Sequence, residues 1–317
     1  MSFWYVRFFP LLFILEDVHL IGSHWPLETT FPTVCGHEGA GVVAVIGNGV
    51  THLKIGDRVG IKWLNSACGR CEYCLQTYEG QCPDAKFTGF SLNGTFQEYA
   101  IGNAEYVAQI PENVPLAAAT AVLCAGVTVY KGIKEANPGA GQWIAILGAA
   151  GGLGHLAIQY AKACGLQVLA IDTGESADKL CINLGADQFI NYKTSIDVAV
   201  DVKGITKGGA HIVLVVASGN AYTQAISFLR PKGVLIALGL APNTIIESDL
   251  FWHVLNGYTI KGSLTGNRKD TDEALAFVAR GIVKVSYNIL PFSSLPKVLD
   301  DLKQSKVVGR VVLDISK

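Results

Sequence analysis

Four cysteines crowded into residues 68–82 carry the strongest chemical signal in this 317-residue chain. They follow the pattern Cys-x2-Cys-x2-Cys-x7-Cys, at Cys68, Cys71, Cys74 and Cys82. Such short spacings let thiolates converge from one tight loop on a zinc ion, with sulfur–zinc distances of about 2.3 Å. Four thiolates leave no open position, so the pattern predicts a structural zinc site that orders a lobe poor in apolar residues. An iron–sulfur cluster and disulfide bonds are the alternatives, and an intracellular setting disfavours both.

A second group of metal-binding residue types consists of His37, Glu38 and Cys124. Imidazole is a good zinc ligand, and a carboxylate beside it can be a further ligand or a hydrogen-bond partner of the histidine. Taken alone, a His-Glu pair is most often a polar turn, and a cysteine in the apolar segment AVLCAG is most often a buried core thiol. Their assignment to a metal therefore depends on the family resemblance given below.

A glycine-rich turn, Gly148–Gly154, lies between a predicted buried strand at Trp143–Leu147 and an amphipathic helix. Without side chains, this turn lets the backbone approach a pyrophosphate at the helix N-terminus. Asp172 falls 18 residues after Gly154, at the tip of the next strand. A carboxylate there can accept hydrogen bonds from a ribose and would repel a 2′-phosphate, which favours NAD over NADP. Because Ala149 takes the first glycine place of the fingerprint, an ordinary strand–turn–helix packing turn remains the alternative.

The composition excludes several classes of protein. Half of the residues are apolar, 16% are charged and the formal net charge is -1, so no basic tract predicts binding to nucleic acid or to an anionic membrane. The apolar run 3–15 is too short to span a bilayer and lacks the basic start of a signal peptide. It is predicted to be a buried strand or an unnatural start of the reading frame. Eight cysteines beside a dinucleotide fold favour a reducing compartment, so we expect a cytoplasmic protein.

The elements that must position these residues follow from the apolar periodicity. Residues 31–61 alternate short apolar segments with glycine turns, which predicts a small β-barrel with strands at 41–46 and 57–62. The cysteine lobe at 64–94 is loop-like, strand character returns at 96–110, and a helix is predicted over 116–136.

From residue 139 the pattern becomes strand–helix–strand repeatedly, which predicts an α/β doubly wound parallel sheet. Helices are expected between the strands, for example at Glu175–Leu184 and Ala221–Leu229. The tail is predicted to hold helices at Thr271–Arg280 and Ser294–Gln304 and a closing strand at Arg310–Ile315. The six predicted strands lie near 143–147, 167–172, 187–191, 211–217, 233–239 and 258–263.

In this order, the motifs GHEGAGVV, GIKWLN, the four-cysteine lobe, LCAGVTVYKG, GAAGGLG and VVGRVV resemble the zinc-dependent medium-chain alcohol dehydrogenases, in particular the tetrameric fungal ethanol enzymes. The resemblance runs from about Trp25 to the C-terminus. It implies a GroES-like β-barrel catalytic domain (1–125 and 264–317) interrupted by a Rossmann NAD-binding domain (126–263). It also implies NAD-dependent oxidation of small primary alcohols to aldehydes, and the reverse, by zinc-assisted hydride transfer in a homotetramer.

The resemblance assigns roles to individual positions. His37 and Cys124 match ligands of a catalytic zinc, and Glu38 matches an acid that can swing onto this zinc. His19 matches the end of the proton relay, and Asp17 matches the acid behind the zinc-bound histidine. The matched cofactor and pocket positions are Gly151, Gly152, Leu153, Gly154, Asp172 and Arg310 for NAD, Thr128 against the nicotinamide, and Trp25 and Trp63 as pocket walls.

The chain departs from the family just before His19. The family's Cys-His-Thr-Asp is replaced by Ile14, Leu15, Glu16 and Asp17, so one zinc-binding cysteine and the relay hydroxyl are absent. A catalytically impaired relative that still binds NAD and the structural zinc is therefore the alternative function. A zinc-free quinone reductase of the same superfamily is disfavoured because His37 and Cys124 are retained. Cys35 would substitute as a ligand only if an extended segment turned it the same way as His37, which we do not favour.

Overall fold

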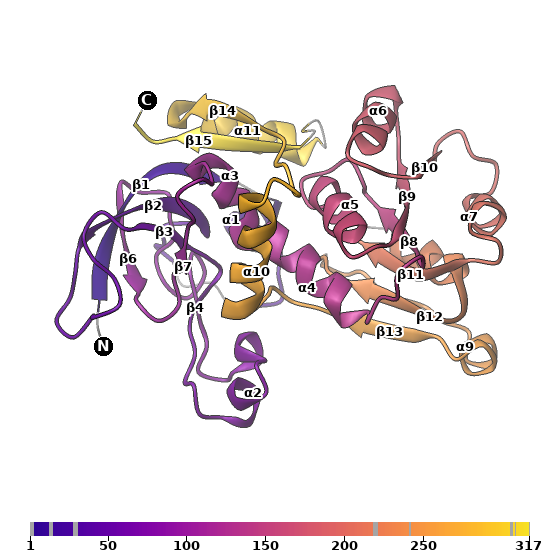
Figure 1. The fold of residues 1–317 in the computed structure, drawn as a ribbon, viewed down its shortest axis with the longest axis horizontal. Coiled ribbons are helices and arrows are strands. Elements are labelled where there is room, and N and C mark those ends of the chain that lie inside the picture. The colour runs from indigo at the N-terminus through magenta and orange to yellow at the C-terminus, as the bar shows by residue number, and fades with distance from the viewer. Residues whose placement is uncertain are drawn as a thin grey trace. The chain divides into compact units, whose positions relative to one another are not determined.

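The computed structural model describes residues 3–12, 15–27, 31–217, 221–240, 242–304, 307 and 309–316, and for residues 3–5, 9, 10, 15 and 16 it describes the backbone alone. The chain divides into two compact units (Figure 1). The first comprises Met1–Val127 with Thr265–Lys317, and the second comprises Thr128–Leu264. The domain boundaries expected from the sequence, between residues 125 and 126 and between 263 and 264, lie within two residues of these.

Within the described residues, the first unit is built on a seven-stranded, largely antiparallel sheet of order β14-β15-β1-β2-β3-β7, with β6 paired to β1. Val6 of β1, Val43 of β2, and Val59 and Ile61 of β3 meet in its core, where each is at most 2% exposed. These strands position the site residues that follow. Their bounds are β1 Phe3–Leu12, β2 Glu38–Val45, β3 Arg58–Ile61, β6 Tyr99–Asn103, β7 Ala108–Gln109, β14 Tyr287–Pro291 and β15 Arg310–Asp314.

The N-terminal apolar run forms a strand of this sheet, β1, which confirms the prediction of a buried strand. Val6 and Phe8 point into the core while Arg7 between them is exposed, which is the alternation of a half-buried strand. The pairing with β2 shifts register between Phe8 and Leu11. Beyond that irregularity β1 pairs with β15, so the N-terminal and C-terminal strands lie side by side.

A continuous helix runs over 116–135, close to the predicted range. It consists of α3 (Leu116–Ala121), a π-helical turn (Val122–Gly126) and α4 (Val127–Glu135). Among the described residues it is the one helix long and apolar enough to cross a membrane, but 83% of its most apolar window is buried inside the protein. Such burial is typical of a core helix.

Four further α-helices belong to the described part of the first unit: α1 (Leu15–Ile21), α2 (Glu72–Leu75), α10 (Arg268–Ala279) and α11 (Leu295–Lys303). The prediction that α10 begins at Thr271 was wrong by three residues. Asn267 caps this helix, accepting from the Asp270 N–H, while the Asp270 side chain accepts from the Asn267 N–H. This capping box builds a polar first turn, which apolar periodicity does not reveal.

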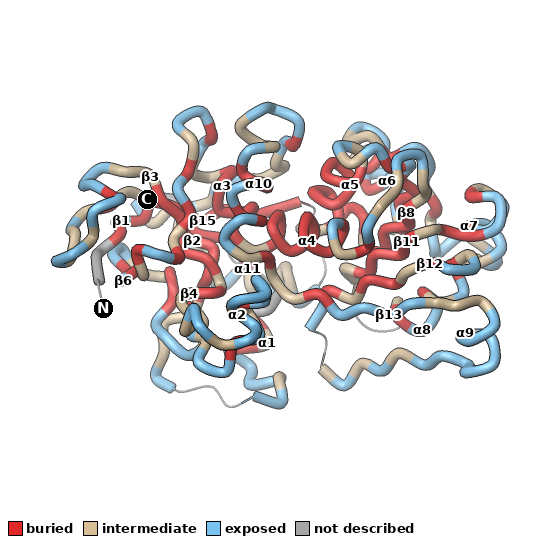
Figure 2. The backbone as a smooth tube through the Cα atoms, turned by 60° about the horizontal axis from the view of Figure 1, so that its bottom comes forward, coloured by how far each residue is buried: buried red, intermediate tan, exposed pale blue. Residues whose placement is uncertain are grey.

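The second unit is a six-stranded parallel sheet of order β10-β9-β8-β11-β12-β13, with helices between the strands, which confirms the doubly wound prediction. Figure 2 shows buried backbone concentrated along its central strands β8 and β11. The strands are β8 Trp143–Leu147, β9 Gln167–Asp172, β10 Gln188–Asn191, β11 Ala210–Val215, β12 Leu229–Ala237 and β13 Thr259–Gly262. The helices are α5 Gly154–Ala163, α6 Glu175–Asn183, α7 Val198–Thr206, α8 Ala221–Ala225 and α9 Leu250–Asn256.

The predicted helix Ala221–Leu229 was wrong at its C-terminal end. The α-helix stops at Ala225, a 3-10 turn follows, and Leu229 already pairs with Ala210 of β11. The pairing of β12 with β11 contains a register shift in this early part, and Lys232 adopts a φ of 66°. Because the first part of the strand is irregular, the apolar pattern of the sequence did not indicate it.

Candidate functional site

The four cysteines of the lobe form a cluster that fits a zinc ion. All four Sγ atoms lie within 4.8 Å of one another, and Cys68 Sγ lies 3.9 Å from Cys74 Sγ. Sulfurs held tetrahedrally at about 2.3 Å from zinc are about 3.8 Å apart, so little movement is needed to bind the metal. In the described part of the chain, this is the one such group of three or more histidine, cysteine or acidic side chains.

The surroundings of the cluster favour thiolates only in part. Hydrogen bonds from the backbone N–H groups of Arg70 and Cys71 lower the pKa of Cys68 to about 6. Burial, together with hydrogen bonds among the neighbouring thiols, raises the pKa of Cys74 to about 12. The cluster therefore does not ionise fully by itself, and zinc binding must displace protons from it. The lobe is otherwise held by short elements: β4 (Leu64–Ser66) paired with β5 (Lys86–Phe87), and α2 (Glu72–Leu75).

His37 lies just before β2 and is brought together with Cys124 of the π-helical turn. His37 is 3% exposed, and its Nδ1 lies 3.7 Å from Asp17 Oδ1 on α1. Asp17 also accepts a hydrogen bond from the Gly36 N–H at 3.1 Å, which fixes the carboxylate behind the imidazole. Burial lowers the pKa of His37, but the charge of Cys124 and hydrogen bonds with Asp17 and Cys124 outweigh it, and the pKa lies well above its ordinary value. Asp17 and Cys124 thus favour a proton on this imidazole, and a zinc ion bound here would have to displace that proton.

Glu38 is turned toward other partners. It is fully buried, and its Oε1 accepts from the Ala125 N–H at 3.0 Å and from Arg310 Nη2 at 3.4 Å. His37, Glu38 and Cys124 accordingly do not form a tight ligand group like that of the lobe. In this conformation Glu38 neutralises Arg310, and its movement onto a metal stays a prediction. Arg310, expected at the pyrophosphate, lies in the first unit against Glu38, with its side chain 5% exposed.

Aromatic side chains stand beside His37, as the resemblance implied. The Trp63 ring lies 4.9 Å from the His37 ring, and the Trp25 ring lies 6.2 Å from Trp63. His19 follows, with its ring 6.4 Å from Trp25. Sequence reasoning missed Phe87, which stacks on Trp63 with 5.1 Å between the ring centroids. The aromatic content of the lobe was the available signal for it.

The nucleotide turn of the second unit is shaped for close approach of a ligand. Gly148 has a φ of 82°, and a Cβ on Gly154 would lie 2.1 Å from the Gly148 carbonyl oxygen, so glycine is required at both places. Gly151, Gly152 and Leu153 complete this turn. Leu153, the N-cap residue of α5, makes no side-chain cap, which favours a phosphate at the start of this helix. The backbone cradle therefore fits the pyrophosphate of NAD.

Asp172 ends β9 next to this turn. Its Oδ2 accepts from the Ala150 N–H and its Oδ1 accepts from the Thr173 N–H, both at 2.8 Å. The carboxylate thus braces the turn, and it lies where a ribose hydroxyl is expected. Thr128, assigned to the nicotinamide, is a buried residue of α4 in the same unit.

Residues 14–16 depart from the family, and Cys35 is the next cysteine along the chain. Ile14 lies outside the described residues, and only the backbone of Leu15 and Glu16 is described. Cys35 is half-buried, and burial followed by the charge of Asp17 raises its pKa to about 11. Gly36 has a φ of 89°, so the segment is not extended and Cys35 does not alternate onto the His37 face as the substitution would require.

Comparison with known proteins identifies relatives of the whole chain. The family model "Alcohol dehydrogenase GroES-like domain" matches residues 14–112, and "Zinc-binding dehydrogenase" matches 152–280. An alcohol dehydrogenase of Schizosaccharomyces pombe is 47% identical over 302 residues, covering 95% of this chain and 86% of that protein. Alcohol dehydrogenase 1 of Emericella nidulans is 44% identical, covering 94% and 86%.

Solved structures agree with these relatives. The alcohol dehydrogenase of Aeropyrum pernix has a TM-score of 0.90 at 27% identity, covering 98% of this chain and 92% of that one. Acetophenone reductase of Geotrichum candidum, solved in complex with NAD, has a TM-score of 0.88 at 25% identity, covering 98% and 89%. With both family domains in order and fungal relatives this similar, the chain belongs to the zinc-dependent medium-chain alcohol dehydrogenases, near the fungal members.

Proposed function

We propose that this protein oxidises small primary alcohols to aldehydes with NAD, and catalyses the reverse reduction. The observation that carries the proposal is the hydrogen-bonded pair of His37 and Cys124 beside the Trp63 ring, in a chain 47% identical to an alcohol dehydrogenase. The aromatic neighbours would supply an apolar wall for the alkyl part of a small alcohol. NAD and zinc are the cofactors that this family uses.

The residues of the chain divide the work. His37 and Cys124 would hold the catalytic zinc, which supplies Lewis-acid polarisation of the alcohol oxygen when bound. Asp17 fixes the orientation and charge of the His37 imidazole. His19 would take the alcohol proton toward solvent, and Asp172 would bind the ribose and repel a 2′-phosphate.

One observation favours a second candidate function, an impaired relative that binds NAD and the structural zinc. The family's third ligand position holds Ile14, whose side chain has no atom that binds a metal, and the relay hydroxyl position holds Glu16. Two measurements distinguish the active dehydrogenase from the impaired relative. One is the zinc content per chain, by elemental analysis after dialysis against a weak chelator, and the other is ethanol-dependent NAD reduction. Two zincs with activity support the dehydrogenase. One zinc without activity supports the impaired relative.

We also propose a homotetramer in a reducing, cytoplasmic setting. The helix α9 carries five exposed apolar side chains: Leu250, Phe251, Trp252, Val254 and Leu255, between 55% and 76% exposed. Beside β12, strand β13 is an edge of the parallel sheet and its residues are exposed. Exposed apolar patches and open sheet edges are usually covered by a partner, here a second copy. The four thiolates of the lobe require a compartment that keeps them reduced.

Light scattering of the purified chain tests this assembly. A tetrameric mass supports the proposal, and Val254→Asp with Leu255→Asp should then lower the mass by placing charge in the apolar patch. A monomeric wild-type chain would contradict the proposed assembly.

A further inference from the structure

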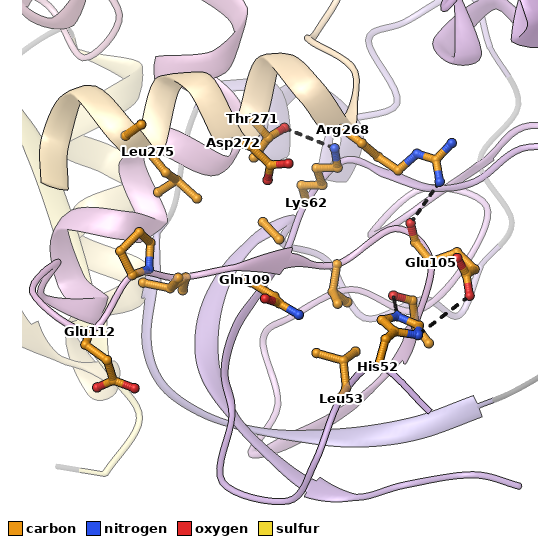
Figure 3. A pocket seen from close by; sticks show the side chains of 16 residues that line it. His52, Leu53, Lys62, Glu105, Gln109, Glu112, Arg268, Thr271, Asp272 and Leu275 are labelled. Carbon is orange, nitrogen blue, oxygen red and sulfur yellow. Dashed lines mark hydrogen bonds and ion pairs between the residues drawn. The ribbon is translucent and has the colours of Figure 1, made fainter. Parts of the chain in front are cut away.

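A cavity of about 610 Å³ lies in the first unit, apart from both metal sites and from the aromatic wall. It is formed by residues 52–53, the segment 104–112 that contains β7, and one face of α10, as Figure 3 shows. None of the metal-binding or NAD-binding residues assigned above lines it. Its lining mixes apolar side chains, such as Leu53 and Leu275, with the cation of Lys62 and the carboxyl of Asp272.

Lys62, directly after β3, is the unusual group of this cavity. The residue is 2% exposed, and its Nζ donates to Thr271 Oγ1 at 3.0 Å. The Thr271 hydroxyl is neutral, and it donates its own hydrogen to the Asn267 carbonyl oxygen at 2.8 Å. Among the described residues, Lys62 makes no ion pair, although an ammonium group has three N–H donors to satisfy. A buried amine at a cavity wall with one neutral hydrogen-bond partner can bind a ligand that enters the cavity.

The charges around Lys62 decide its protonation. Burial lowers its pKa to about 8, and Arg268 adds to this lowering, while Glu79, Asp272 and Asp270 oppose it. At neutral pH the amine is therefore neutral in about a tenth of the molecules, against about 0.04% for an ordinary exposed lysine. A neutral amine carries a lone pair and is a nucleophile.

We propose that Lys62 Nζ is a covalent binding site for small aldehydes, which it captures in this cavity as a reversible imine. The aldehyde class rests on the proposed function, because the enzyme releases aldehydes as products. The cavity has room for a short alkyl chain against Leu53 and Leu275. An anionic ligand fits less well, because Asp272, Glu105 and Glu112 also line the cavity.

The reaction balances without any oxidant or further reactant. The Nζ lone pair attacks the carbonyl carbon, a C–N bond forms, and the carbonyl π pair moves to the oxygen, which takes the proton lost by nitrogen. The resulting carbinolamine loses its oxygen as water when the nitrogen lone pair forms the C=N bond. Asp272, whose pKa burial raises, lines the cavity beside Lys62 and can exchange the protons of this dehydration.

Reductive trapping of the whole purified enzyme tests the proposal. The protein is treated with propanal and sodium cyanoborohydride at neutral pH, and N-propyl-lysines are located over time by peptide mass spectrometry. Lys179, whose side chain is 77% exposed in a surface helix, is the internal reference. We expect Lys62 to be labelled at least about tenfold faster than Lys179, since its larger neutral fraction outweighs its lower intrinsic nucleophilicity.

Three results decide the matter. Equal or slower labelling of Lys62 than of Lys179 would overturn the proposal. A labelling rate that levels off above about pH 8 supports it, because an ordinary lysine reacts faster up to about pH 10.4. Lys62→Arg, which keeps the charge but cannot form the imine, should remove the label from this peptide and leave the other lysines unchanged. Because propanal is added directly, the outcome does not depend on whether the chain oxidises alcohols.

Discussion

Arg268 joins the helix α10 to the zinc lobe, and its removal should destabilise the lobe selectively. Its Nη2 and Nε donate to Glu79 Oε1 at 2.6 Å and 3.1 Å. Glu79 is 6% exposed, and its other oxygen has no hydrogen-bond partner among the described residues. Arg268 is therefore the cation that hydrogen-bonds this carboxylate, while Lys62 acts on it through charge alone. Arg268→Met would leave the buried carboxylate without its hydrogen-bonding cation.

The size of the effect follows from burial on the two sides of the pair. Breaking a fully buried ion pair costs about 3–5 kcal/mol. The Arg268 side chain is 47% exposed, so water would reach part of the Glu79 carboxylate after truncation, and we expect a loss of about 2–3 kcal/mol. Lys269→Met is the matched control, because Lys269 pairs with Glu273 on the surface at 80% exposure and should cost at most about 0.5 kcal/mol.

Urea unfolding, followed by zinc release to a coloured chelator and by total tryptophan fluorescence, measures this difference. Zinc release reports the local transition of the lobe, because the four cysteines lie in it. Adding Glu79→Gln to Arg268→Met should recover about half of the lost stability, because a neutral amide is easier to bury than an unpaired carboxylate. Equal midpoints for the Arg268 and Lys269 variants, or no recovery in the double variant, would refute the reasoning.

Three other predictions follow from single groups. Gly154→Ala should abolish NAD binding in fluorescence titrations while leaving zinc content unchanged, because its Cβ would overlap the Gly148 carbonyl oxygen at 2.1 Å. Asp172→Gly should raise the KM for NAD and narrow the preference for NAD over NADP at least about tenfold in steady-state kinetics, because the repulsion of a 2′-phosphate is removed. Lys62 has a folded pKa of about 8, below its unfolded value, so the unfolded chain binds more protons between these pKa values. The free energy of unfolding of the wild type, relative to Lys62→Met, should therefore rise by about 2–3 kcal/mol from pH 8 to pH 10.4, and a flat difference would contradict the pKa shift.

Local sequence patterns predicted the strands of the parallel sheet and the cysteine lobe, because each is formed by a short continuous segment. The parallel strands were placed to within a few residues because each is a short apolar run between turns. Two element starts were predicted too late. The Asn267 cap adds a polar first turn to α10, and β12 begins before the irregular residue Lys232. The cysteine lobe was readable because its four ligands come from one loop of the chain.

Pairs distant in the chain could not be predicted in this way. Glu38 and Arg310 are 272 positions apart, and Lys62 and Thr271 are 209 apart. No periodicity links such residues, because the tertiary fold creates these contacts: β1 joins β2 and β15 in one sheet, and α10 packs against β7, the neighbour of β3. The resemblance named Arg310 as a phosphate ligand but not its carboxylate partner, and nothing in the sequence marked Lys62 as a buried amine.

The two metal sites differ in the number of secondary-structure elements that supply their residues. This number determines how each site responds to residues 14–16, which differ from the family's sequence. The lobe draws every ligand from residues 68–82 and is fixed by its own backbone hydrogen bonds. The His37 site needs α1 for Asp17, the start of β2 for His37 and the π-helical turn for Cys124. A change in the segment that leads into α1 therefore reaches only the second site, directly through a lost ligand and indirectly through the position of Asp17. Zinc should accordingly leave the His37 site at a lower chelator concentration than the lobe, whether or not that site supports turnover.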